Sequence, residues 1–196
     1  MVASAYVSRD GALAVTAGDL MTSAPETAIA ARLVVDDTPQ AEQPDEQATL
    51  FLVASSGGHL LEMLSLRRAW ERHERVWVTF ATQDAVDLLE GEGVIWAFHP
   101  TNRNLRNLVR NLLLAWRTLR RERPDALFST GAGIAVPFIW IAWLLRIPTT
   151  YVESLTRIHR LSLSGRLVYP VSSHFYVQWP ELTKQYPRAQ YWGRIL

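Results

Sequence analysis

A histidine follows two glycines within residues 51–66, FLVASSGGHLLEMLSL. Residues 51–54 form the short apolar run of a strand that is covered on both faces, and leucines then recur at helical spacing. Glycine permits backbone angles that a Cβ forbids, and the first amides of a helix lack internal partners, so they can bind an anion. We predict a phosphate or diphosphate site at Ser56, Gly57 and Gly58. Glycines that serve only packing are the alternative.

His59 begins the helix at the carboxyl end of that strand, where open α/β sheets bind their ligands. An imidazole in this position is suited to proton transfer or to orienting an acceptor hydroxyl. A histidine that merely starts the helix with its ring half-buried is the other interpretation. The neighbouring glycines favour the functional one, because a histidine beside a candidate anion site at a strand end meets two positional criteria for an active site.

Two further loops follow strands of the same kind. Residues 129–133 (STGAG) repeat the small residues, hydroxyl and glycines of the first turn, and Thr130, Gly131, Ala132 and Gly133 are candidates for the same anion. Glu153 and Ser154 follow the fifth strand, where a carboxylate can hydrogen-bond sugar hydroxyls or accept a proton. Tight turns and a solvated strand-end glutamate are the alternatives.

The elements that position these loops alternate in type. Each of five expected strands is followed by a helical pattern or a loop, which predicts an α/β fold with a doubly wound, Rossmann-like parallel sheet. The strands are expected at 51–54, 75–80, 94–98, 126–128 and 149–152, with a sixth at 175–178. Helices are expected at 59–66, 82–89, 102–123, 133–145, 161–169 and 181–185.

Composition limits the chemistry. The chain has 196 residues, 48% of them hydrophobic, which is enough for a sizeable core. It contains no cysteine and no clustered histidine motif, so we expect no protein-bound metal and no cofactor.

The net charge of the chain changes from acidic to basic at about residue 50. Residues 1–50 carry eight acidic and two basic side chains, and the remainder carries 18 basic and 11 acidic ones. Residues 1–48 are polar without a sustained period, so we expect a disordered acidic extension followed by one domain at 49–196. The extension also lacks a secretory signal pattern, which leads us to expect a cytoplasmic protein.

The long helix expected at 102–123 carries an apolar stripe and seven arginines. Its apolar residues are Leu105, Leu108, Val109, Leu112, Trp116 and Leu119. Arg103, Arg106 and Arg110 suit an anionic membrane surface, and residues 132–145 are uncharged but too short to span a bilayer. A solvated arginine face is the alternative. The basic residues match no nucleic-acid motif, so we expect no nucleic acid as a partner.

Several of these segments together resemble a known family. Residues 55–60 (SSGGHL), 124–125 (PD), 129–133 (STGAG), 151–154 (YVES) and 177–179 (VQW) are similar to the acceptor-side subunit of split glycosyltransferases. These include the PssD, EpsE and CpsF-like proteins of bacterial polysaccharide synthesis and the eukaryotic asparagine-linked-glycosylation subunit. The amino-terminal half of MurG is also similar.

The resemblance implies half of a GT-B glycosyltransferase. A separate small chain would bind the UDP-sugar, and this chain would bind a polyprenyl-diphosphate-linked acceptor at the inner face of the plasma membrane. His59 and Glu153 would then be catalytic, the two glycine turns would hold the acceptor diphosphate, and Ser154 would contact the acceptor sugar. The aromatic residues of the tail, Trp179, Tyr186 and Trp192, are expected at the contact with the second chain, or packed on their own domain.

Two other classes of function stay open. A non-catalytic scaffold would recruit a catalytic partner to the membrane and would tolerate changes at His59 and Glu153. A nucleotide-binding Rossmann protein is disfavoured, because no G-x-G-x-x-G follows the first strand and no acidic residue ends the second one.

Overall fold

The computed structural model describes residues 4–7, 13–16, 47–101 and 104–195. Its main feature is a seven-stranded sheet in the order β5-β4-β3-β6-β7-β8-β9, in which every neighbouring pair is parallel. This order reverses direction between β3 and β6, as in a doubly wound fold. The strands are β3 (Thr49–Val53), β4 (Glu74–Phe80), β5 (Val94–Ala97), β6 (Ala126–Ser129), β7 (Thr149–Val152), β8 (His174–Val177) and β9 (Ala189–Tyr191).

The central strands bury apolar side chains on both faces. Phe51 and Val53 of β3 belong to one core cluster, and Leu50 and Leu52 belong to the cluster on the opposite face. Successive side chains of a strand point to opposite faces, so a continuous apolar run specifies a strand that is covered on both sides. The α/β fold class predicted from the sequence is confirmed.

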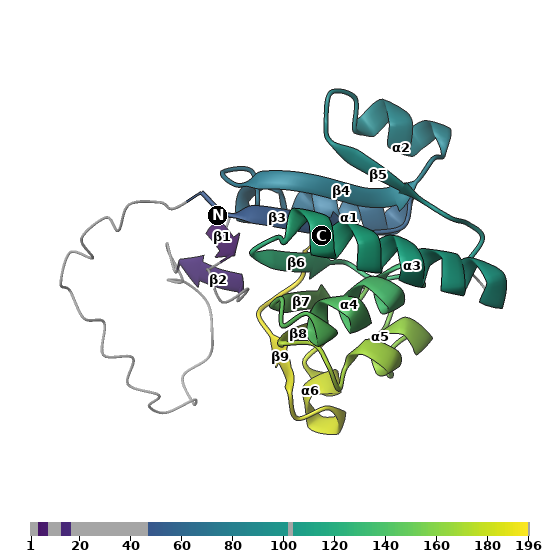
Figure 1. The fold of residues 1–196 in the computed structure, drawn as a ribbon. Coiled ribbons are helices and arrows are strands. Elements are labelled where there is room, and N and C mark those ends of the chain that lie inside the picture. The colour runs from purple at the N-terminus through teal and green to yellow at the C-terminus, as the bar shows by residue number, and fades with distance from the viewer. Residues whose placement is uncertain (1–3, 8–12, 17–46, 102–103, 196) are drawn as a thin grey trace, which may run out of the picture.

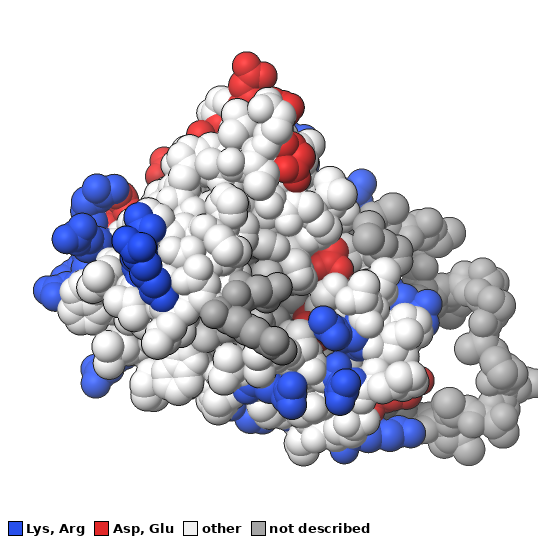
Figure 2. Space-filling model, turned by 90° about the vertical axis from the view of Figure 1, so that its right-hand side faces the viewer, with Lys and Arg blue, Asp and Glu red and all other residues white. Residues whose placement is uncertain are grey.

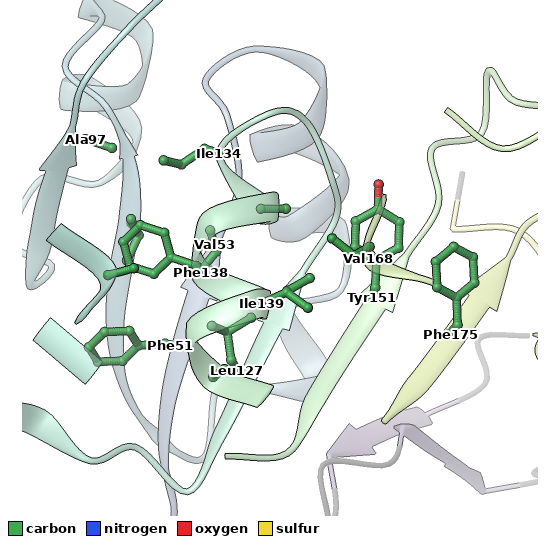
Figure 3. Close-up of a cluster of buried hydrophobic side chains, with 14 of the residues drawn as sticks. Phe51, Val53, Ala97, Leu127, Ile134, Phe138, Ile139, Tyr151, Val168 and Phe175 are labelled. Atoms are coloured by element: carbon green, nitrogen blue, oxygen red, sulfur yellow. The ribbon is translucent and has the colours of Figure 1, made fainter. Parts of the chain in front are cut away.

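Helices cover both faces of the sheet (Figure 1). The cluster that contains Phe51 is covered by α3, α4, α5 and α6, and the other cluster is covered by α1, the 3₁₀ turn η1 and α2. Figure 3 shows Phe138 and Ile139 of α4 lying over Phe51 and Leu127 of the strands. The helices are α1 (Gly58–Ser65), η1 (Arg67–Ala69), α2 (Gln83–Leu88), α3 (Leu105–Glu122), α4 (Ala135–Leu144), α5 (Leu163–Val168) and α6 (Glu181–Gln185).

The face that α3 buries is more polar than its apolar stripe. Asn107, Asn111 and Thr118 are buried, whereas Leu105 and Val109 are exposed. The Asn111 amide accepts from the Phe98 N–H at 2.9 Å and donates to the Phe98 carbonyl at 2.8 Å, so it satisfies the backbone of the loop that enters the helix. Buried polar groups are stable when they are hydrogen-bonded in this way. Of the apolar stripe, Leu105 and Val109 are exposed, Leu108, Leu112 and Trp116 are half-buried, and Leu119 is buried in the core.

Two short strands lie in the amino-terminal segment that was expected to have no structure. β1 (Ser4–Val7) and β2 (Leu13–Thr16) pair antiparallel in a separate sheet. The sequence analysis did not predict these two strands, although Tyr and Val are residues that favour strands. The other residues up to 46 lie outside the described part of the chain. The sequence also did not predict β9 or η1.

Candidate active site

The loops after β3 and β6 meet at the point where the strand order reverses. The Thr130 hydroxyl donates to the His59 carbonyl at 2.6 Å, and His59 Nδ1 lies 2.8 Å from the Thr130 carbonyl. These reciprocal bonds join two residues that are 71 positions apart. The convergence that was predicted from the two glycine turns is present in the fold.

The contact with Thr130 determines the protonation of the His59 ring. A carbonyl only accepts hydrogen bonds, so Nδ1 must carry the proton. Nε2 of the neutral ring then has a free lone pair, and it has no hydrogen-bond partner among the described residues. The side chain is 28% exposed. The ring of His59 is thus fixed in orientation through Nδ1, with Nε2 left unbonded.

The first glycine turn is open on the side that a ligand would occupy. A Cβ added at Gly58 would meet no atom within 4 Å, so neither packing nor a positive φ explains this glycine. The Gly57 N–H donates to Asp84 Oδ2 at 3.1 Å and is therefore already engaged. The N–H groups of Gly58 and His59 form no hydrogen bond with another described residue, and Ser56 is half-buried.

The second turn has structural reasons for its small residues. Gly131 has a φ of 116°, and a Cβ there would lie 3.1 Å from His59 Cε1, so only glycine fits beside the imidazole. At Gly133, a Cβ would meet Thr101 Oγ1 at 2.8 Å. Ala132 has a φ of 69°. The Gly131 N–H donates to Ser129 Oγ at 3.1 Å, which leaves the amides of Ala132 and Gly133 for a ligand.

Glu153 lies inside the domain instead of facing solvent. It is 1% exposed, and its oxygens accept from the Ser154 N–H at 3.0 Å and from the Ser162 N–H and hydroxyl at 2.9 and 3.0 Å. Burial raises the pKa of Glu153, although these hydrogen bonds and Arg157 act in the opposite direction. In this arrangement the carboxylate holds the loop that follows β7.

Glu62 completes the site, and the sequence reasoning missed it. Its carboxylate is buried, lies 3.5 Å from His59 Nδ1 through Oε2, and accepts from the Ser154 hydroxyl and the Leu155 N–H at 3.1 Å through Oε1. Ser154 therefore points toward Glu62. The available signal was the spacing of three residues from His59, which places both side chains on one helix face.

Several groups determine the pKa of His59. Burial lowers it, but the hydrogen bond and charge of Glu62, the Thr130 carbonyl and the charge of Glu153 together outweigh burial, so the pKa is raised above 6.5. The raised pKa favours the protonated form of the ring, and a histidine can both accept and return a proton.

The Tyr151 hydroxyl lies beside Gly131, on the buried side of the site. Its ring stacks on Phe175 at 5.0 Å, and Figure 3 shows the hydroxyl pointing away from this contact. A Cβ at Gly131 would lie 3.1 Å from that hydroxyl, which is buried and has no hydrogen-bond partner among the described residues. Burial and the charge of Glu153 raise the pKa of Tyr151, so the group stays a donor.

Basic side chains surround the end of the molecule toward which the strands point (Figure 2), and acidic ones gather at the top of this view, on the side of α2. Arg106 and Arg110 are exposed, and the Arg110 guanidinium lies 3.9 Å from the centre of the Phe98 ring. Arg103 lies outside the described residues. Beside these arginines, α3 and α4 form an apolar cavity of about 380 Å³, lined by Leu108, Leu112, Val136, Pro137, Trp140, Ile141, Trp143 and Leu144.

The aromatic residues of the tail divide into two groups. Trp179 donates to the Leu155 carbonyl at 2.7 Å, and Tyr186 packs on Tyr169 at 5.5 Å, so both belong to their own domain. Trp192 contacts Tyr176 but remains 51% exposed. No described helix is both long and apolar enough to cross a membrane.

The fold and the candidate site define a doubly wound, Rossmann-like α/β domain with a histidine and two glycine turns at its switch point. Its family follows from similarity in sequence. The chain belongs to the Alg14-like family of oligosaccharide biosynthesis proteins, whose model matches residues 100–195. It is 31% identical to the UDP-N-acetylglucosamine transferase subunit ALG14 of Yarrowia lipolytica, covering 75% of this chain and 81% of the relative. For the Rattus norvegicus and Homo sapiens subunits the identities are 30% and 28%, each covering 78% of this chain and 85% of the relative.

Solved structures share the fold at low sequence identity. MurG of Acinetobacter baumannii aligns with a TM-score of 0.57 at 17% identity, covering 68% of this chain and 42% of that chain. UDP-N-acetylglucosamine 2-epimerase from Rickettsia bellii aligns with a TM-score of 0.61 at 12% identity, covering 76% and 45%. The chain spans less than half of each of these structures.

Proposed function

We propose that this chain is the acceptor-binding subunit of a two-component glycosyltransferase. It would take part in moving GlcNAc or another hexose from a UDP-sugar to a polyprenyl-diphosphate-linked acceptor in polysaccharide biosynthesis, in the manner of the bacterial PssD, EpsE and CpsF-like proteins. The relatives that are named as UDP-N-acetylglucosamine transferase subunits support this class of reaction. The catalytic unit would need a second chain.

The observation that carries the proposal is the orientation of His59. With Nδ1 bonded to the Thr130 carbonyl at 2.8 Å, Nε2 can take the proton from an acceptor hydroxyl as that oxygen attacks the sugar. Glu153 was expected to share this role. Because its oxygens already accept three hydrogen bonds, we propose that it acts by holding the loop that carries Ser154.

The acceptor diphosphate would bind between the two turns. The N–H groups of Gly58 and His59 at the start of α1, and those of Ala132 and Gly133 before α4, are not used within the described structure. Amides at a helix start favour an anion through hydrogen bonding and the helix dipole. Ser56 and Thr130 border the same space, although the Thr130 hydroxyl is already bonded to His59.

The lipid part of the acceptor would place the domain on the inner face of the plasma membrane. Trp143 and Leu144 are 53% and 58% exposed and line the α3–α4 cavity. Arg106 and Arg110 lie on α3, which also exposes Leu105 and Val109. Aromatic and apolar side chains next to cations suit an anionic bilayer interface. Attachment would be peripheral, with Arg103 as a third cation.

A non-catalytic scaffold would use the same apolar face, but its function would not depend on His59. Titration of the chain with a UDP-sugar, with NAD and with a polyprenyl diphosphate, each with and without the second subunit, separates the possibilities. The proposed function predicts that the lipid diphosphate binds this chain alone and that the UDP-sugar requires the partner. Tight binding of the UDP-sugar or of NAD to this chain alone would contradict it.

A further inference from the structure

The carboxylate of Glu62 is buried and hydrogen-bonded, although a purely structural glutamate on a surface helix is normally solvated. It is 6% exposed, and its two oxygens serve different parts of the site. Oε2 lies 3.5 Å from His59 Nδ1, and Oε1 accepts from the loop after β7 at Ser154 and Leu155. A buried carboxylate is stable only when it is paired and hydrogen-bonded, and both conditions are met here.

The two contacts at His59 Nδ1 have separate effects. The Thr130 carbonyl, at 2.8 Å, takes the Nδ1 proton and fixes the orientation of the ring. Glu62, at 3.5 Å, adds a negative charge on the same side of the ring, opposite Nε2. When Nε2 takes up a proton, the imidazolium forms directly beside this charge, and nearby opposite charge stabilises the charged form.

We propose that Glu62 is a positioning residue of the active site, whose carboxylate stabilises protonated His59 and ties the imidazole to the loop at Ser154 and Leu155. This inference rests on the proposed function, because it assigns His59 the role of base. In the reaction, the acceptor O–H bond breaks as that oxygen bonds to the sugar, the proton moves to Nε2, and the UDP leaves with the electrons of the bond that joined it to the sugar.

The pairing has a defined pH signature. The other ionisable groups near the ring are Glu153 and the Tyr151 hydroxyl, and both side chains are kept in Glu62→Gln. The charge of Glu62 also helps to raise the pKa of Tyr151, but burial is the larger cause and persists in this variant. Removing the anion from beside the imidazolium lowers the pKa of His59. The acidic limb of kcat/KM then moves to lower pH, because the neutral base persists to lower pH.

The experiment compares Glu62→Gln, Glu62→Asp and the control Glu71→Gln. Glu71 is an exposed glutamate that pairs with Arg67 at 3.1 Å, away from the site. NMR titration of His59 in the chain alone should give a lower pKa in Glu62→Gln than in wild type, a smaller decrease in Glu62→Asp, and no change in Glu71→Gln. With the second subunit, Glu62→Gln should lose about tenfold in kcat and show the shifted acidic limb, as expected for a group that orients a catalytic histidine. Glu62→Asp should recover part of the rate.

Two results would overturn the inference. One is a His59 pKa in Glu62→Gln that equals that of the wild type, and the other is an unchanged rate with an unshifted pH profile. If the wild-type pair of subunits shows no transfer at all, the proposed function fails and with it the catalytic part of this inference, while a lower pKa in Glu62→Gln would still uphold the pairing.

Discussion

The imidazole of His59 is fixed on one edge by Thr130 and Glu62 and free on the other, at Nε2. This asymmetry is what the proposed role of His59 as a base requires. The sequence predicted the position of His59 because glycine turns are visible in any sequence. It did not reveal Glu62, since a glutamate on a short amphipathic helix is normally solvated and its burial depends on a loop about 90 residues further along the chain.

Replacing His59 with alanine should reduce the turnover of the two-subunit enzyme at least about a hundredfold, because proton transfer by a positioned side chain contributes 10²–10⁴-fold. The measurement is kcat with saturating UDP-sugar and acceptor. His73→Ala is a matched control, since His73 directly precedes β4 at the opposite end of the sheet. Unchanged turnover in His59→Ala, with the fold intact, would exclude His59 as the base.

At the scale of elements, most strands and helices could be predicted from the sequence. The residues that each element buries could not always be predicted. Apolar periodicity identified α3 correctly, but it did not indicate that three polar side chains of α3 are buried in hydrogen bonds to backbone carbonyl or amide groups. β9 has three residues, of which only Ala189 is buried, and so gives no periodic signal. The buried face of α3 therefore depends on tertiary hydrogen bonds, which local sequence patterns do not reveal.

The loop from β7 to α5 depends on a close approach between Gly165 and Glu153. A Cβ at Gly165 would clash with Glu153 Oε2 and lie 3.1 Å from the Ser162 hydroxyl. We predict that Gly165→Ala lowers the free energy of unfolding by about 1–3 kcal/mol, as overpacking of a filled site does. Chemical denaturation measures this value. Gly93→Ala is the control, because its Cβ would come no nearer than 3.8 Å to another atom, and equal stability of the two variants would contradict the packing described for Glu153.

At the scale of the whole molecule, α3 exposes Leu105 and Val109, and α4 exposes Trp140, Trp143 and Leu144. Exposed apolar side chains that gather on one surface suit contact with a membrane. We predict co-sedimentation with anionic liposomes that weakens as salt rises, because salt screens exposed charges beyond about 8 Å at physiological ionic strength.

Trp143→Ala should weaken this liposome binding about tenfold, since burial of a large aromatic side chain in the interface contributes on the order of 1–3 kcal/mol. Trp192→Ala, with a nearly equal exposure of 51% against 53%, is the control and should bind as wild type does. Absence of co-sedimentation at low salt, or equal loss in both variants, would show that the α3–α4 surface does not contact the bilayer.

The central claim is that this chain supplies the acceptor half of the reaction and needs a second subunit for the other half. Its most direct test is transfer of GlcNAc from UDP-GlcNAc to a polyprenyl-diphosphate acceptor by the purified chain, by the purified small subunit, and by the two together. The account predicts turnover only in the mixture, and predicts that His59→Ala in this chain abolishes nearly all of it. Full turnover by this chain without any second protein would contradict the account.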